Sequence, residues 1–163
     1  MKVLLVNKFF FPKGGAETVF FQERNFLLEQ EVEVVDFSME DKNNFPSPFS
    51  DFFVPHIDYY EQNSVRQRIR NGLSFVHSSV AVKNIEQLIV RERPDIAHLH
   101  NVYHQLTPSI IPVLKKHGVK VVLTLHDCKL ICPSYLALSK NNTICTRCEG
   151  KKFWRPFTSN CQS

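Results

Sequence analysis

The sequence has no uninterrupted run of about 18 apolar residues, the length that a membrane-spanning helix requires. Its 163 residues include only five glycines, which do not form the spaced triplet of a dinucleotide-binding turn, and the P-loop lysine signature is missing. These absences disfavour a membrane-spanning protein, a P-loop protein and a nicotinamide-dependent oxidoreductase. The apolar run after Met1-Lys2 is too short for a signal-peptide core, so we expect a cytoplasmic protein.

The composition is that of a globular protein. Hydrophobic residues make up 43% of the chain and charged residues 22%, which excludes a disordered, collagen-like or coiled-coil chain. At roughly 100–200 residues per domain, the length allows one domain and hardly a second. A domain of this size buries about two-thirds of its unfolded surface, so we expect a proper hydrophobic core.

Cysteine and net charge are confined to the end of the chain. Cysteine is absent before Cys128, and all five cysteines lie between Cys128 and Cys161. Five basic residues from Lys140 onward face one acid, Glu149, so this end carries the whole formal charge of +4. We therefore predict a body of residues 1–127 and a cysteine-rich basic tail of residues 128–163.

Short β-rich runs alternate with helical stretches along the body. Strands are predicted at residues 2–6, 32–37, 52–54, 96–100 and 119–125, and helices at residues 16–30, 65–91 and 108–117. This alternation predicts an α/β fold with a parallel, doubly wound sheet, followed by a loop-rich tail. Ligands of such sheets bind outside the carboxyl ends of the strands, so we expect loops 14–15, 100–101 and 126–127 to line one crevice.

Gly14 and Gly15 precede the first predicted helix. Their backbone N–H groups could face an anion at the positive end of the helix, and the missing side chains would let a phosphate or sugar approach closely. The alternative is a tight turn without a ligand. Asp36 ends the second predicted strand, where a ribose-binding acid can sit, but without the glycine fingerprint this indication is weak.

Histidines gather after two predicted strands. His126 follows a buried strand and could bond a substrate hydroxyl or move a proton near neutral pH, unless local backbone groups satisfy it. His98 and His100 share one face of a strand, so a metal-binding pair is conceivable. The sequence indicates no third ligand for such a pair.

Four cysteines have a symmetric spacing. Cys132, Cys145, Cys148 and Cys161 are separated by twelve, two and twelve residues. A Cys-x-x-Cys pair with two flanking thiols can form a tetrahedral zinc site, which would supply folding energy to a tail that is short of apolar residues. Free thiols and two disulfides remain alternatives. Cys128 lies outside the symmetric pattern.

The basic tail also contains aromatic residues. Phe153 and Trp154 lie among Lys151, Lys152 and Arg155, where they could stack on nucleic-acid bases. More often such a cluster is a hydrophobic anchor beneath a solvated basic face. It could also touch an anionic membrane surface, although about five charges without a lipid anchor bind weakly.

Several motifs follow one another in a recognisable order. They are Met1-Lys2-Val3-Leu4-Leu5-Val6 with Gly14-Gly15-Ala16-Glu17, then Pro94-Asp95-Ile96-Ala97-His98-Leu99-His100-Asn101, then Thr124-Leu125-His126-Asp127 with Cys132-Pro133. In this order and spacing, the chain resembles the amino-terminal half of a family-4 glycosyltransferase. The resemblance covers nearly the whole chain.

The resemblance implies the GT-B architecture, in which two Rossmann-like halves face each other across a cleft. It implies transfer of a sugar from a nucleotide-sugar donor to an acceptor, without a catalytic metal. Gly14 and Gly15 would lie near the donor phosphate, and His126 would contact the transferred sugar near the reaction centre. The residues expected to shape the acceptor side are Glu17, His100, Asn101 and Asp127.

The second half of such an enzyme binds most of the nucleotide-sugar, and nothing in these 163 residues resembles it. We therefore expect a truncated chain that is inactive alone and needs a carboxy-terminal donor-binding domain or a split subunit as its partner. The expected acceptor is a glycan or glycolipid of cell-surface polysaccharide synthesis, with peripheral contact at the inner face of the membrane as an option. The alternative is a zinc-stabilised binding module that contacts nucleic acid or protein, with nucleic acid the less favoured partner.

Overall fold

The computed structural model describes residues 1–56, 77–139, 141–150, 152, 154–155 and 161. The chain divides into two compact units, Met1–Thr124 and Leu125–Ser163. The sequence predicts this division after residue 127, whereas the structure places it after Thr124. Leu125, His126 and Asp127 therefore belong to the second unit. Within the described residues, no helix is long and apolar enough to cross a membrane.

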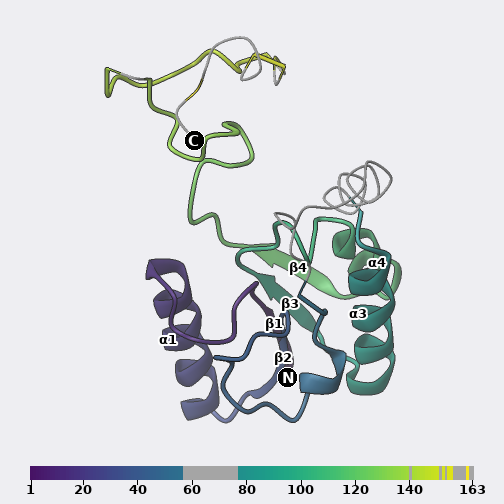
Figure 1. Cartoon of the computed structure of the whole chain (residues 1–163). Coiled ribbons are helices and arrows are strands. Elements are labelled where there is room, and N and C mark those ends of the chain that lie inside the picture. Colours follow the sequence, from purple (N-terminus) through teal and green to yellow (C-terminus); the bar gives the residue numbers. More distant parts are fainter. Residues whose placement is uncertain (57–76, 140, 151, 153, 156–160, 162–163) are drawn as a thin grey trace. The chain divides into compact units, whose positions relative to one another are not determined.

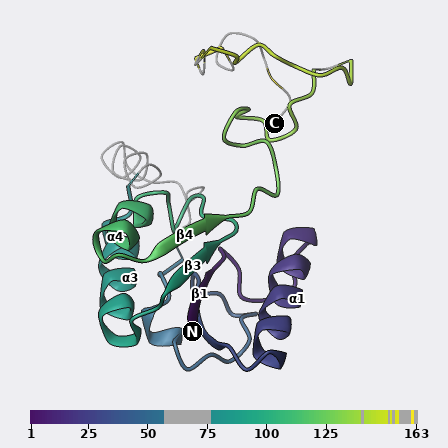
Figure 2. The ribbon, with the colours of Figure 1, turned by 180° about the vertical axis from the view of Figure 1, so that it is seen from behind.

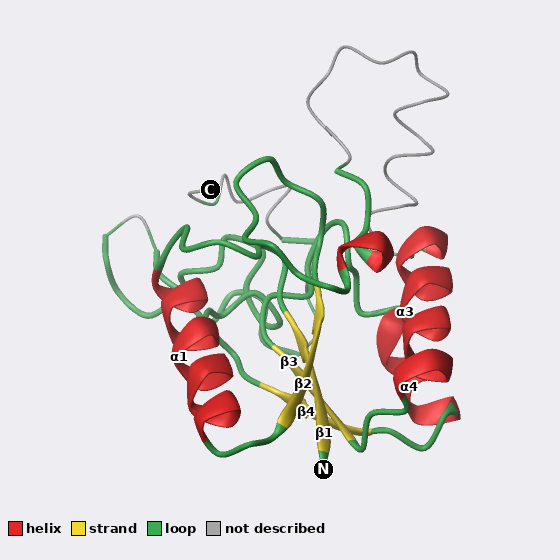
Figure 3. Ribbon diagram, turned by 90° about the horizontal axis from the view of Figure 1, so that it is seen from below, coloured by secondary structure: helices red, strands yellow, loops and turns green. Residues whose placement is uncertain are grey.

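The first unit is built on a parallel sheet of four strands. These are β1 (Lys2–Val6), β2 (Glu33–Phe37), β3 (Ile96–Leu99) and β4 (Lys120–Leu123), in the order β2-β1-β3-β4. Helix α1 (Gly15–Glu29) covers one face, and α3 (Ser79–Glu92) and α4 (Ile110–Lys116) cover the other, as Figures 1, 2 and 3 show. The predicted α/β, doubly wound, Rossmann-like fold is confirmed.

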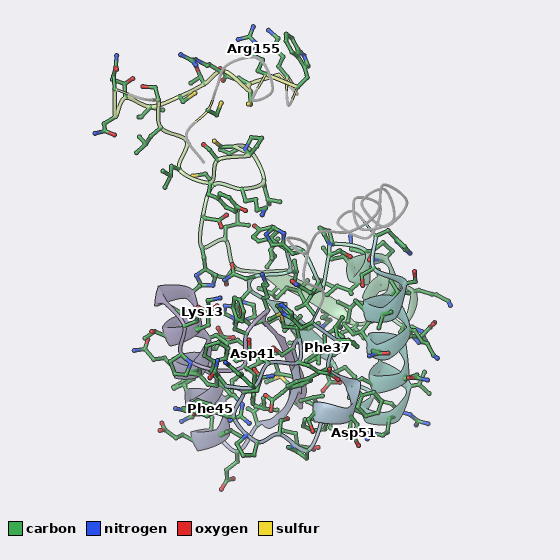
Figure 4. All side chains as sticks on the ribbon, viewed as in Figure 1. Lys13, Phe37, Asp41, Phe45, Asp51 and Arg155 are labelled. Carbon is green, nitrogen blue, oxygen red and sulfur yellow. The ribbon has the colours of Figure 1, made fainter. Side chains whose placement is uncertain are left out.

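Strand β1 is buried on both faces of this sheet. Leu4 and Val6 belong to one core cluster, which also contains the side chains that α3 and α4 bury. Val3 and Leu5 belong to a second cluster, which contains Phe20 of α1. Side chains alternate along a strand, so a strand with helices on both faces must be apolar at every position, as residues 3–6 are. Phe37, at the end of β2, is fully buried in the first cluster (Figure 4).

The segment 52–54, predicted as a strand, forms a different structure. Ser50–Phe52 is a single 3-10 turn, and Val54 then forms one isolated bridge with Met39. Phe53 and Val54 are buried in different core clusters. This alternation resembles that of a strand, which explains the wrong prediction.

Helix α3 begins later than the predicted helix at residues 65–91. Ser78 is its N-cap, and its hydroxyl oxygen accepts a hydrogen bond from the backbone N–H of Ala81 at 3.2 Å. The helix ends at Arg93, which adopts the left-handed conformation with φ of 50°. The part of the prediction that falls on residues 65–76 lies outside the described residues.

The second unit has neither helix nor strand among its described residues. It is a succession of turns with one isolated antiparallel bridge between Leu138 and Ile144. This agrees with the loop-rich tail that the sequence predicts.

A buried ion pair joins α1 to β2. The Arg24 guanidinium donates from Nε to Oδ1 of Asp36 at 2.8 Å and from Nη2 to Oδ2 at 3.0 Å. The Ser47 hydroxyl donates to Oδ2 at 3.1 Å, and Asp36 is fully buried. The ribose-binding role considered for Asp36 has no support here, because partners within the chain engage both carboxylate oxygens.

Replacing Arg24 with Met should lower the free energy of unfolding by about 3 kcal/mol, because it leaves the Asp36 carboxylate buried without its counter-charge. Urea denaturation of both proteins measures this difference. Lys116→Met is the matched control, since Lys116 pairs with Glu86 at the surface, where such pairs contribute little. Equal, small effects of the two substitutions would contradict the prediction.

Candidate functional site

Polar side chains collect where β1 and β3 end. From β1 the chain passes to α1 on one face of the sheet, and from β3 it passes to α4 on the other face. The carboxyl ends of these neighbouring strands are therefore the switch point at which doubly wound sheets bind their ligands. The residues gathered here are Asn7, Glu17, Glu23, His98, His100 and, through its backbone N–H, Asn101.

Asn7, the first residue after β1, connects three segments through its amide. Its Nδ2 donates to the Phe9 carbonyl at 2.8 Å and to Oε1 of Glu17 on α1 at 3.3 Å. Its Oδ1 accepts from the backbone N–H of Asn101, after β3, at 3.2 Å. Asn7 is fully buried and Glu17 is nearly so. The loops after β1 and β3 are therefore held together by hydrogen bonds.

A second group joins α1 to the end of β3. One carboxylate oxygen of Glu23 contacts Nδ1 of His98, and the other lies 3.4 Å from Nε2 of His100. The two imidazole rings stack with centroids 4.5 Å apart, which confirms that both histidines share one face. His100 is buried, and its ring forms a T-shaped pair with the ring of Phe20, with centroids 5.3 Å apart.

His98 also bonds to the residue that follows β4. Its Nε2 lies 2.7 Å from Oγ1 of Thr124, so the imidazole stands between a carboxylate and a hydroxyl. These two contacts fix the orientation of the ring. These contacts connect α1, β3 and the end of β4.

This group corrects one expectation. The sequence indicated no third ligand for His98 and His100, but the structure supplies Glu23. Among the described residues, these three form the group whose ligand atoms all lie within 4.8 Å of one another. Two imidazoles and one carboxylate are a set that a divalent metal ion can use. Without a metal, the Glu23 carboxylate and the Thr124 hydroxyl engage both ring nitrogens of His98.

Gly14 and Gly15 lie at the beginning of α1. Gly14 is the N-cap, with extended backbone and no side-chain cap, and both residues are exposed. A Cβ atom at Gly15 would meet nothing within 4 Å. Packing within the chain therefore does not require glycine at position 15, and the helix N-terminus is open to a group from outside.

His126 and Asp127 belong to the second unit. His126 is half-buried, and Oδ1 of Asp127 accepts a hydrogen bond from the backbone N–H of Lys129 at 2.8 Å. Asp127 thereby closes its own turn. The acceptor-side group predicted from sequence thus falls into Glu17, His100 and Asn101 in the first unit and Asp127 in the second.

Sequence reasoning missed two residues of this edge. The sequence could have pointed to Asn7, since a polar residue directly after a buried strand lies where such sheets bind ligands. It could not have pointed to Glu23, because a charged residue in the middle of a helix is ordinarily a solvated surface residue. Its contact with His98 spans 75 positions of sequence.

Comparison with known proteins decides the family. Residues 13–152 match the sequence profile described as Glycosyltransferase Family 4. The chain belongs to glycosyltransferase family 4. Searches of curated proteins and of solved structures found no match.

Membership of the family accounts for the Rossmann-like fold of the first unit and supports a glycosyltransferase-like role. The matched region begins before α1 and ends beyond Cys148. It therefore includes Glu17, Glu23, His98, His100 and Asn101, but not Asn7, and much of the second unit. The resemblance noted in the motifs is therefore confirmed at the level of the family.

Substituting Asn7 with Asp should lower the free energy of unfolding by about 3 kcal/mol. The change keeps the size of the side chain but replaces a buried donor with a second carboxylate beside Glu17 and the Phe9 carbonyl. Denaturant titration measures the effect. Asn25→Asp, the same change at an exposed position of α1, should have little effect, and a similar loss in both would argue against the bridging role of Asn7.

Proposed function

We propose that this chain is the acceptor-binding, amino-terminal part of a glycosyltransferase. The enzyme would move a sugar from a nucleotide-sugar donor to a glycan or glycolipid in cell-surface polysaccharide synthesis, on the cytoplasmic side of the membrane. The family match over residues 13–152 carries the proposal. The polar groups at the ends of β1 and β3 agree with it, because carboxylates, amides and imidazoles are the groups that bind sugar hydroxyls.

The residues proposed for the acceptor side differ in burial, and we assign the buried and the partly exposed ones to different roles. Glu17 and His100 are buried and engaged with Asn7 and Glu23, so we assign them to positioning. Asn101 is partly exposed, and the side chains of His98 and Glu23 are 17% and 26% exposed. These three can reach an acceptor hydroxyl, and we propose that they form the acceptor-binding surface of the first unit.

The donor would approach the beginning of α1. Backbone N–H groups at a helix N-terminus attract anions, and Gly14 and Gly15 place no side chain in the way. We propose that they meet the donor phosphate. A donor-binding half would hold the rest of the nucleotide, and no catalytic metal is invoked.

His126 is the proposed catalytic residue. As in the family that the chain resembles, it would contact the transferred sugar near the reaction centre, with Asp127 holding the turn that follows it. Transfer also requires the leaving diphosphate to be stabilised in the same site. We therefore propose that the 163 residues alone do not transfer sugar.

Joining the chain to a family-4 donor-binding half tests the role of His126. In this joined protein, His126→Ala should lower kcat by about 100-fold or more, because it removes an interaction made at the reaction centre. Steady-state sugar transfer and the urea midpoint are measured together. His117→Ala is the control, since His117 follows α4 and pairs with Glu86, and it should retain transfer. Near-normal transfer by His126→Ala with an unchanged midpoint would overturn the assignment.

The isolated chain is expected to release no sugar from a set of nucleotide-sugars. Product analysis measures this activity. Sugar transfer by the isolated chain would contradict the requirement for a partner half.

The isolated chain is also expected to bind nucleic acid weakly. In its basic tail Trp154 is 60% exposed, and the Arg155 guanidinium lies 5.8 Å from the Trp154 ring, while Lys151 and Phe153 lie outside the described residues. Fluorescence titration with nucleic acid at two salt concentrations measures this binding. Tight, salt-sensitive binding would favour the alternative, a zinc-stabilised binding module.

A further inference from the structure

Helix α1 and strand β3 bring a set of metal-binding side chains together in the first unit. Among the described residues, Glu23, His98 and His100 form the group whose ligand atoms all lie within 4.8 Å of one another. The four cysteines for which the sequence predicts zinc are free thiols of the second unit and do not form such a group. The four-cysteine site stays a prediction, and the geometry directs attention to Glu23 and its two histidines.

The contact between Glu23 and His100 has the length expected of two ligands on one ion. Oε2 of Glu23 lies 3.4 Å from Nε2 of His100. This separation exceeds the range of about 2.7–3.2 Å that N–H···O hydrogen bonds usually have. Zinc binds imidazole nitrogens and carboxylate oxygens at about 2.0–2.2 Å, so two ligand atoms on a tetrahedral zinc ion are about 3.4 Å apart. The observed separation therefore fits a shared zinc ion better than a direct hydrogen bond.

The two ring nitrogens of His98 have different partners. Nδ1 contacts the other carboxylate oxygen of Glu23, while Nε2 lies 2.7 Å from Oγ1 of Thr124. A metal-binding imidazole ordinarily uses its second ring nitrogen for a hydrogen bond of this kind, which fixes the ring and its tautomer. With the proton on Nε2, where the Thr124 oxygen can accept it, the lone pair of Nδ1 is available to an ion. A small rotation of the partly exposed Glu23 carboxylate would make room for that ion.

The packing of α1 holds Glu23 in place. The next residue, Arg24, donates two hydrogen bonds to Asp36 of β2. Phe20, three residues before Glu23, is fully buried, and its ring forms a T-shaped pair with the ring of His100. The carboxylate and the imidazoles are therefore largely in position before an ion binds, which lowers the conformational entropy that binding costs.

Charge and access also favour an ion at this place. In the described part of the chain, the ion-pair partners of Glu23 are His98 and His100, and neither lysine nor arginine is paired with its carboxylate. A divalent cation would supply the full counter-charge that neutral imidazoles lack. The side chains of Glu23 and His98 are 26% and 17% exposed, so an ion can enter from solvent and water can supply a fourth ligand.

We propose that Glu23, His98 and His100 bind one Zn²⁺ ion, with water as the fourth ligand, and that this ion fixes α1 to the end of β3. Imidazole favours zinc over Mg²⁺ and Ca²⁺, which prefer oxygen ligands. The role is structural, and binding of the ion does not depend on the function proposed above. In the zinc-loaded chain, Glu23 and His98 would meet an acceptor through the zinc-bound water.

Zinc titration of the full chain by calorimetry tests the site. All five thiols are first alkylated, so that cysteines cannot bind the metal, and the chain should then bind about one Zn²⁺. Glu23→Gln should weaken binding by about 100-fold or more, and Thr124→Val by about 10-fold, because it removes the hydrogen bond that orients His98. Glu86→Gln is the matched control, since Glu86 pairs with the single imidazole of His117, and it should bind zinc like the parent. A parent protein that binds no zinc, or equal losses in Glu23→Gln and Glu86→Gln, would overturn the site.

Histidine NMR covers the case in which Glu23→Gln fails to fold, because it uses the alkylated parent protein. Zinc should shift the imidazole signals of His98 and His100 and leave that of His117 unchanged. Shifts at other histidines in place of these two would assign the metal to another site and refute the proposal. Unshifted signals of His98 and His100 at saturating zinc would mean that Glu23 and the two imidazoles interact without a metal, which refutes it as well.

Discussion

Burial of strand β1 on both faces is the constraint on which the first unit depends. Its side chains alternate between two core clusters, with Leu4 and Val6 in one and Val3 and Leu5 in the other. A strand of this kind cannot face water, so helices must cover both sides of the sheet. Its neighbours β2 and β3 run parallel to it, which brings their carboxyl ends to the same edge.

At the carboxyl ends of β1 and β3, polar side chains follow the apolar side chains of the strands. Asn7 is buried like the strand before it, and a buried amide is tolerated only when its donors and acceptor are satisfied. Its hydrogen bonds to Phe9, Glu17 and Asn101 meet this requirement and at the same time join α1 to the loop after β3. The polar side chains at the ends of β1 and β3 are thus positioned by the same interactions that complete the core.

The two units are stabilised by different kinds of interaction. The first buries large side chains such as Phe10, Phe20 and Phe37. The described part of the second buries none of its large apolar side chains, and its order rests on turns and on one isolated bridge.

The sequence by itself determined the fold class, the family and most elements of the first unit. Residues 2–6, 16–30 and 96–100 were predicted close to β1, α1 and β3, because a buried strand and a helix are patterns of neighbouring residues. The segment 52–54 was predicted wrongly, since a 3-10 turn and one bridge can bury alternate side chains as a strand does. Only the tertiary structure decided that Glu23 meets His98 and His100, that Asn7 joins two loops and that Arg24 engages Asp36. These contacts depend on how α1 packs against the sheet, and no pattern of neighbouring residues contains that information.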